Sequence, residues 1–245
     1  MTAREAAPTQ AAPHVLVPSP SSPPRRSALD ETSTVEVRWI LLGQLDAAVT
    51  GWFGRFTGGM ESREDAYLTD PVLRGLSVKI RAGQMLEVKQ YDGSPGIHDT
   101  AGLARGRLES WRKWSFPFGP LGPNIVGTPG WTVVQKRRRM SRFRLARGRL
   151  VTGARQRATE SACAVELTEV RVNDETWWTL GFEATGRADL LLSTLQNTAA
   201  LVFAQPPPGD VVFDMNHCQS YAEWLSRRPS NGGWRVNKAT SAGSP

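Results

Sequence analysis

The stretch LSVKIRAGQMLEVK, from Leu76 to Lys89, decides the fold, because it reads as two β-strands joined by a tight turn. Apolar and polar residues alternate on both sides of the central AGQ turn. Strict alternation is typical of a strand with one buried face and one polar face. The polar face carries Lys79, Arg81 and Lys89, with the single carboxylate Glu87. These cations face either bulk water or an enclosed anion, and the rest of the chain must decide between the two.

The same one-sided pattern recurs through the middle of the chain. It predicts further strands over Thr34–Leu42, Arg63–Leu68, Trp131–Leu145, Ala162–Val172 and Thr176–Ala184. Helices are expected over Leu45–Phe53, Ala101–Leu108, Arg187–Phe203 and Tyr221–Ser226, and a loop over Ser115–Gly130. The last helix has Ser220 as its N-cap and Glu223 three residues later, which completes a capping box. The pattern fits a sandwich or an α+β sheet with solvated charges, which the pattern alone favours, and it also fits a closed barrel with a charged lumen.

Composition indicates an anionic partner without naming it. The chain has 245 residues, a net charge of +7 and a sequence pI near 10.0. A modest basic excess suits a phosphorylated metabolite, a nucleic acid or a membrane surface. The segment from Trp111 to Ala158 has no Asp or Glu and twelve Lys or Arg. We do not expect a nucleic-acid partner, because no recognised binding motif accompanies these cations and most of them fall in predicted strands.

The ends of the chain differ in composition from its middle. Residues 1–33 are rich in Ala, Pro, Ser and Thr and are expected to be disordered, and residues 229–245 are expected to be flexible. We therefore expect one domain over residues 34–228. No apolar run is long enough for a membrane helix. Cys163 and Cys218 lack metal-ligand spacing, which favours a reduced cytoplasmic protein and leaves a single disulfide open. The oligomeric state is left open.

The order of the strands resembles that of the CYTH, or triphosphate tunnel, superfamily. Members of that family open with a strand of the form E-x-E-x-K and continue with a Tyr-Asp-rich strand and a pair of the form L-R-I-R and L-T-L-K. Basic strands follow, and then strands that end near E-I-E. The matching segments here are Val35–Trp39, Arg63–Leu68, Ser77–Arg81, Leu86–Lys89, Lys136–Arg144, Glu166 and Gly181–Glu183. The resemblance covers about residues 34–204 and rests on the order and type of the strands.

The resemblance implies an α+β fold, in which an antiparallel eight-stranded β-barrel forms a tunnel and the helices pack outside. It implies a metal-dependent hydrolase, or a related enzyme, that acts on a small molecule bearing a di- or triphosphate. The residues expected to bind this substrate are Arg38, Lys79, Arg81, Lys89, Lys136, Arg138, Arg142 and Arg144. The catalytic candidates are Glu36, Glu183 and Lys89, and the candidate ligands of Mg²⁺ or Mn²⁺ are Glu36, Glu166 and Glu183, with Glu87 as a further possibility.

Two departures from the family pattern keep other functions open. Glu36 can match either the first or the second glutamate of E-x-E-x-K, and in both cases the other glutamate is missing. In the last strand, Gly181 stands two residues before Glu183, where an acid is expected. A lumen with fewer metal ligands also suits an anion-binding module without catalysis, or a tunnel that serves another reaction on an organic phosphate. Trp177 is expected either in the lumen or packed under a loop. Four further acids, Asp46, Asp65, Asp70 and Asp92, are expected at the surface or in turns.

Overall fold

The computed structural model of the protein describes residues 31–56, 58–70, 72–73, 75–117, 128–146, 149–152 and 161–228. Its strands are β1 (Thr32–Leu42), β2 (Gly59–Leu68), β3 (Leu76–Arg81), β4 (Met85–Thr100), β5 (Ala104–Pro117), β6 (Trp131–Ala146), β7 (Arg149–Thr152), β8 (Ala162–Val172) and β9 (Glu175–Thr185). Its helices are α1 (Ala47–Gly54), the short 3-10 turn η1 (Ala188–Leu190), α2 (Leu191–Val202) and α3 (Tyr221–Ser226). Within these residues, no helix has the length and hydrophobicity that crossing a membrane requires.

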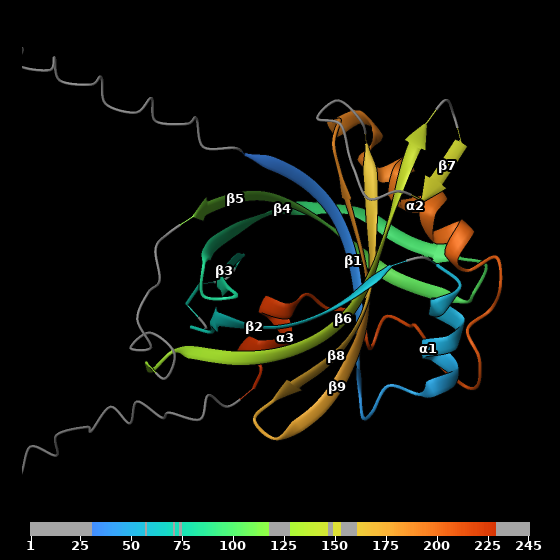
Figure 1. The fold of residues 1–245 in the computed structure, drawn as a ribbon. Helices are drawn as coiled ribbons and strands as arrows, with labels where there is room; N and C mark the ends of the chain where they lie inside the picture. The colour runs from blue at the N-terminus through green and yellow to red at the C-terminus, as the bar shows by residue number, and fades with distance from the viewer. Residues whose placement is uncertain are drawn as a thin grey trace, which may run out of the picture.

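Eight strands close into an antiparallel barrel, which confirms the expected fold (Figure 1). Neighbours follow the order β2-β3-β4-β5-β1-β9-β8-β6, and a pairing between β2 and β6 joins the two ends. β7 pairs with β6 and lies beyond the ring of eight strands. Because side chains alternate along a strand, closure sends one face of every strand into the lumen.

The termini only partly fall within the described residues. The expected tails over residues 1–33 and 229–245 lie outside them except at residues 31–33, and β1 already begins at Thr32. Most of the expected loop over residues 115–130 also lies outside, although β5 continues to Pro117.

The helix expected over Ala101–Leu108 is wrong, because this segment turns from β4 into β5. Ala101 and Gly102 adopt positive φ angles of 47° and 77°, which reverse the chain between two long strands. Ala104 and Leu108 are both buried and lie four residues apart. A spacing of four fits one face of a helix and also one face of a strand, so it cannot separate the two.

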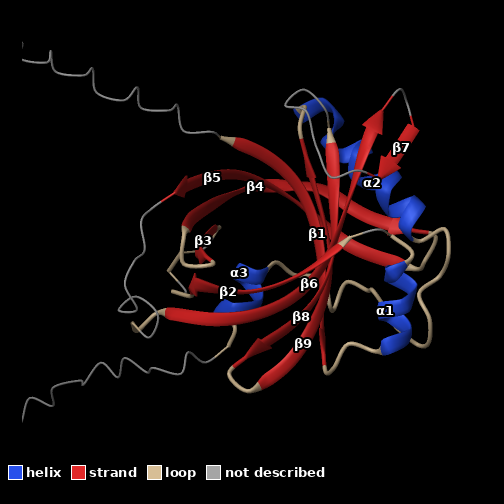
Figure 2. Cartoon of the chain, viewed as in Figure 1, coloured by secondary structure: helices blue, strands red, loops and turns tan. Residues whose placement is uncertain are grey.

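The apolar outer faces of the strands pack against helices on one side of the barrel (Figure 2). α2 contacts β1, β8 and β9, and the main core joins its apolar stripe to the outward residues of these strands. Trp39, Leu180 and Phe182 lie at the centre of this core and are almost fully buried. Since the outward residues are committed to the core, the polar residues between them must face inward.

α3 differs from the other helices because it lies at one end of the lumen instead of outside the barrel (Figure 1). The Ser220 hydroxyl accepts a hydrogen bond from the Glu223 backbone N–H at 3.2 Å, which confirms the predicted cap. Trp224 and Leu225 pack on Ile40 and other inward apolar residues of β6 and β8. The inner face of β1 therefore changes from charged to apolar towards the end that α3 fills.

Candidate anion-binding tunnel

The lumen contains two adjoining cavities lined by charged side chains from most of the strands. The inner one, here called the lumen cavity, has a volume of about 100 Å³ and reaches α3 at Ser220, Tyr221 and Ala222. The outer one, here called the mouth cavity, has a volume of about 640 Å³ and lies towards the opposite end, where β1 begins. Both are lined by Arg38, Arg81, Lys113, Arg138, Glu166 and Glu183, so they are continuous parts of one tunnel.

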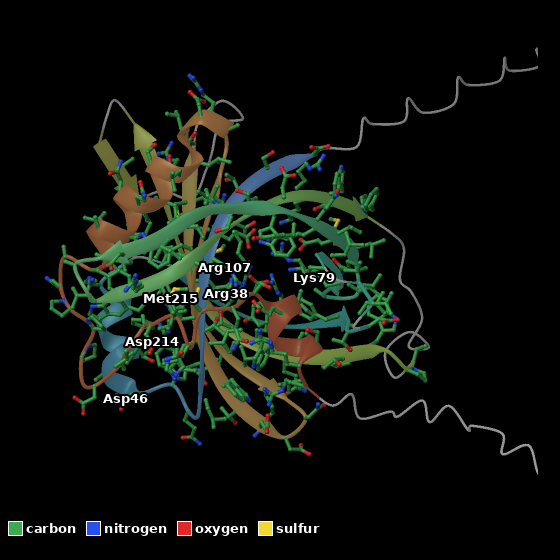
Figure 3. All side chains as sticks on the ribbon, turned by 180° about the vertical axis from the view of Figure 1, so that it is seen from behind. Arg38, Asp46, Lys79, Arg107, Asp214 and Met215 are labelled. Carbon is green, nitrogen blue, oxygen red and sulfur yellow. The ribbon has the colours of Figure 1, made fainter. Side chains whose placement is uncertain are left out.

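Eight cations and five glutamates line the lumen cavity. The cations are Arg38, Arg63, Lys79, Arg81, Lys89, Lys113, Lys136 and Arg138, and they come from β1 to β6. The glutamates are Glu36, Glu87, Glu109, Glu166 and Glu183. Figure 3 shows two of the cations, Arg38 and Lys79, inside the ring of strands, whereas Asp46 and Asp214 lie on the side of α1. Cations that converge from several strands form a site for an anion with several charged oxygens.

Glu87 is the centre of one cluster of cations. Its carboxylate is 2.8 Å from the Lys79 ammonium, 3.2 Å from the Arg81 guanidinium and 3.7 Å from the Lys113 ammonium. Only 3% of its side chain is exposed. Burial acts to raise the pKa of Glu87, but Lys79 and Lys113 outweigh it and hold that pKa well below its usual range. One carboxylate therefore holds together three cations that would otherwise repel one another.

Lys89 joins the two glutamates that were expected to be catalytic. Glu36 on β1 and Glu183 on β9 are direct cross-strand partners, and the Lys89 ammonium contacts Glu36 and lies 3.4 Å from Glu183. The Thr34 hydroxyl donates a hydrogen bond to Glu36 at 2.6 Å. Burial acts to raise the pKa of Glu183, but Lys89 and Lys113 lower it to about 2. Glu183 is therefore ionised near neutral pH where it faces Lys89.

Glu166, on β8 beside the strand of Glu183, is held between two arginines. Its oxygens are 3.1 Å from Arg38 and 2.8 Å from Arg138. Arg38 also donates a hydrogen bond to the Thr179 hydroxyl at 2.9 Å. A Cβ added at Gly181 would lie 2.6 Å from the Arg38 guanidinium carbon, so this glycine leaves the space that Arg38 fills. The absence of an acid at position 181 is thereby explained, since any side chain there would displace Arg38.

The end of the lumen beside α3 combines cations with tyrosines. The Lys136 ammonium is 3.0 Å from Asp65, donates to the Tyr67 hydroxyl at 2.6 Å and lies 3.9 Å from the centre of the Tyr221 ring. The guanidinium of Arg38 lies 4.7 Å from the same ring. Cation–π contacts of this kind are favourable in a desolvated site. Tyr221 therefore fixes α3 to the cations of the lumen.

Most residues predicted to bind the substrate are brought together. Arg38, Lys79, Arg81, Lys89, Lys136 and Arg138 line the lumen cavity, and Arg142 lines the mouth cavity. Arg144 lies on the same face of β6 as Arg142 but lines neither cavity. Trp177 is not among the lining residues and packs on Trp224, with ring centres 5.3 Å apart.

Sequence reasoning missed several residues of the tunnel. Asp65 was expected at the surface, but its side chain is fully buried, because Arg63 and Lys136 neutralise it at 3.1 Å and 3.0 Å. Lys113, Glu109 and Trp111 lie on the inner face of β5. Their alternation from position 109 to 113 is a usable signal, but a tryptophan among charges and the predicted helix before it concealed the strand. Nothing local in the sequence indicates that Tyr221 reaches the lumen.

The predicted metal ligands do not form a metal site in this arrangement. Within the described parts of the chain, no three acidic, histidine or cysteine side chains are grouped so that they could hold a metal ion. Glu166 is occupied by two arginines, and Lys89 lies between Glu36 and Glu183. An ammonium and a divalent cation compete for the same carboxylate oxygens. The residues as arranged do not fit a resident Mg²⁺ or Mn²⁺, and the metal stays a prediction.

Comparisons with known proteins give no name to this arrangement. No protein-family model matches the chain. No curated protein matches it either. Among solved structures, it is similar to a conserved hypothetical protein from Pyrococcus furiosus, with 14% identity, a TM-score of 0.41, and coverage of 77% of this chain and 98% of that one. It is also similar to a protein from Pyrococcus horikoshii OT3, with 12% identity, a TM-score of 0.39, and coverage of 78% and 97%. Similarities at this level carry no argument about function.

Proposed function

We propose that this chain is a tunnel protein of the CYTH type that binds a small molecule bearing a di- or triphosphate. The observation that supports the proposal best is the convergence of eight lysines and arginines on one cavity inside the barrel. Phosphoryl oxygens accept charge-assisted hydrogen bonds from such groups, and arginine adds two parallel bonds to one phosphate. The resemblance in strand order supports the same class of ligand.

Binding is expected to exchange partners within the lumen. In the free protein, Glu87 accepts from Lys79 and Arg81, and Glu166 accepts from Arg38 and Arg138. These contacts keep the cations ordered, so little conformational entropy remains to be lost when the ligand arrives. A polyphosphate offers more charge and more oxygens than one carboxylate, and we expect it to take over part of each cation's hydrogen bonds.

Hydrolysis of the bound ligand is the second candidate function. The observation that favours it is the cross-strand pair Glu36 and Glu183, two carboxylates that face the cations inside the lumen. A carboxylate beside a bound phosphate can position an attacking water or accept its proton. The role of Lys89 in this scheme is to bridge the two carboxylates and to neutralise the departing phosphate.

The test is calorimetric titration of the protein with tripolyphosphate, with and without Mg²⁺. We expect binding without metal, and a loss of at least about tenfold in affinity when Lys79→Gln is combined with Lys89→Gln. The control is Arg137→Gln on the outer side of β6, which faces Glu169 across an exposed ion pair and should leave binding unchanged. Absence of binding in the parent protein refutes the proposal, as does equal binding by the double variant. Phosphate release measured in the same samples decides the question of hydrolysis.

A further inference from the structure

An apolar groove, here called the outer groove, lies on the outer side of the barrel. It has a volume of about 460 Å³ and is formed by the start of α1, the end of β1 and the segment that follows α2. Leu41, Val49 and Val211 line it, and they belong to the main core or pack on it. Val212 lines it too and is 54% exposed. The groove therefore leaves apolar surface open that a further apolar side chain would cover.

The polar part of the outer groove is acidic. Asp46 and Asp210 line it, and no lysine or arginine is among its described lining residues. Asp46 accepts from the Ala48 backbone N–H at 2.6 Å, whereas Asp210 is exposed and has no side-chain partner within the described parts of the chain. Figure 3 shows Asp46 and Asp214 on the side of α1, away from the lumen. This groove suits a partner that carries a large apolar side chain beside cations.

The chain itself contains a segment of matching chemistry. Residues 229–238 read PSNGGWRVNK and include no Asp or Glu. Trp234 and Val236 stand on either side of Arg235, and Lys238 follows two residues later. A tryptophan side chain offers a large apolar ring with one hydrogen-bond donor, and here two cations flank it within four residues. The segment therefore complements an apolar groove that is lined by carboxylates.

The described part of the chain ends near the outer groove. The Arg228 guanidinium lies 4.5 Å from the centre of the Trp177 ring, and Trp177 pairs with Leu42 at the end of β1. Leu41 lines the groove from the opposite face of this strand end. Trp234 follows Arg228 by six residues, which span about 20 Å when extended, and one sheet layer is about 10 Å thick. The intervening chain is long enough to pass around the end of β1.

We propose that the outer groove binds residues 229–238 of the same chain, with the Trp234 ring on the apolar lining and the neighbouring cations beside Asp46 and Asp210. α3 fills one end of the lumen, so a segment bound in this way crosses the end of β1 and holds α3 from outside the barrel. The residues that line the groove do not line the lumen cavity, so the inference is independent of what the tunnel binds.

Limited trypsin digestion of the full chain tests the proposal, because trypsin cleaves after Arg235 and a bound segment must leave the groove before it is cut. A synthetic peptide of residues 229–245 gives the rate for the free segment. We expect cleavage after Arg235 to be at least about tenfold slower in the protein than in the peptide, since cleavage tracks the released fraction. Trp234→Ser should remove this protection, measured against its own peptide, and Trp234→Phe should keep part of it. Cleavage of the parent protein at the rate of the peptide overturns the inference.

Variants of the outer groove locate the binding. Val212→Gln removes an apolar contact and Asp210→Asn removes a counter-charge, so both should speed cleavage after Arg235. The matched control is Leu201→Gln, which is 43% exposed on α2 and does not line the groove. Circular dichroism checks that each variant is folded. Protection that survives in both groove variants, or that Leu201→Gln removes equally, overturns the inference. Protection that is lost on dilution also overturns it, because the bound segment then belongs to a second copy of the chain.

Discussion

Replacing Glu87 with glutamine should make the protein less stable and yet a better anion binder. Glu87 lies within 3.7 Å of Lys79, Arg81 and Lys113, and it is almost fully buried. Glutamine has nearly the same shape but no charge, so it leaves three neighbouring cations without their shared counter-charge. Removing one partner from a buried ion pair typically costs about 3–5 kcal/mol. We take about 3 kcal/mol here, because Arg81 is more than a third exposed and solvent screens its share.

The same change should raise the affinity for tripolyphosphate. In the parent protein, the negative charge of Glu87 repels a bound phosphate. Two unit charges about 4 Å apart interact by about 4 kcal/mol at the effective dielectric of a partly buried site, so removing even a fraction of this repulsion is worth at least about tenfold in binding. Thermal unfolding with and without tripolyphosphate measures both effects in one series. We expect the melting temperature of the free variant to fall by roughly 6–12 °C. Ligand should restore much of this loss, since its stabilisation of the folded state increases with the logarithm of its affinity.

The control for this series is Glu169→Gln on the outer side of β8. Glu169 pairs with Arg137 at 3.6 Å, but both side chains are about half exposed. An exposed pair contributes about 0–1 kcal/mol, so stability and affinity should change little. The reasoning is refuted if Glu87→Gln is as stable as the parent protein, or if it binds tripolyphosphate more weakly.

Three further predictions concern the lumen and α3, which fills one end of it. Stability should decline as the pH falls from about 4.5 towards about 2, because the pKa of Glu183 is lowered in the folded state and its contribution is lost on protonation; acid unfolding monitored by circular dichroism measures this. Gly181→Ala should displace Arg38 and weaken tripolyphosphate binding by about tenfold, as titration would show, whereas the exposed Gly51→Ala should not. Ser220→Ala should cost about 1 kcal/mol in chemical denaturation, since Glu223 loses its cap; an unchanged midpoint would contradict this.

The sequence predicted much of the barrel because the signal is local. In β1, Val35, Val37 and Trp39 alternate with Glu36 and Arg38, and the structure places the first set in the core and the second in the lumen. The pattern failed where the inner face is not uniformly charged. Ile40 faces inward and is buried, because α3 covers that end of the lumen. β5 was hidden for a related reason, since Trp111 lies among charges on its inner face.

The candidate site was harder to predict than the strands. Lys79, Arg81 and Lys89 share a hairpin, so their common face can be read from the sequence. Asp65 and Lys136 are far apart in the chain, and their ion pair depends on the pairing of β2 with β6. A carboxylate expected at the surface or in a turn is instead buried, because Lys136 on the neighbouring strand neutralises it together with Arg63 on its own strand.

By itself, the sequence determined that Leu76 to Lys89 forms two strands with a cationic face, since period-two alternation is a property of the local chain. Only the tertiary structure decided where that face points. Closure of β2 on β6 puts Lys79 and Lys89 inside the barrel, and the pairing of β4 with β5 brings Glu87 within reach of Lys113. The physical reason is that an ion pair between distant segments depends on strand order and register, and neither is written in the alternation of any single strand.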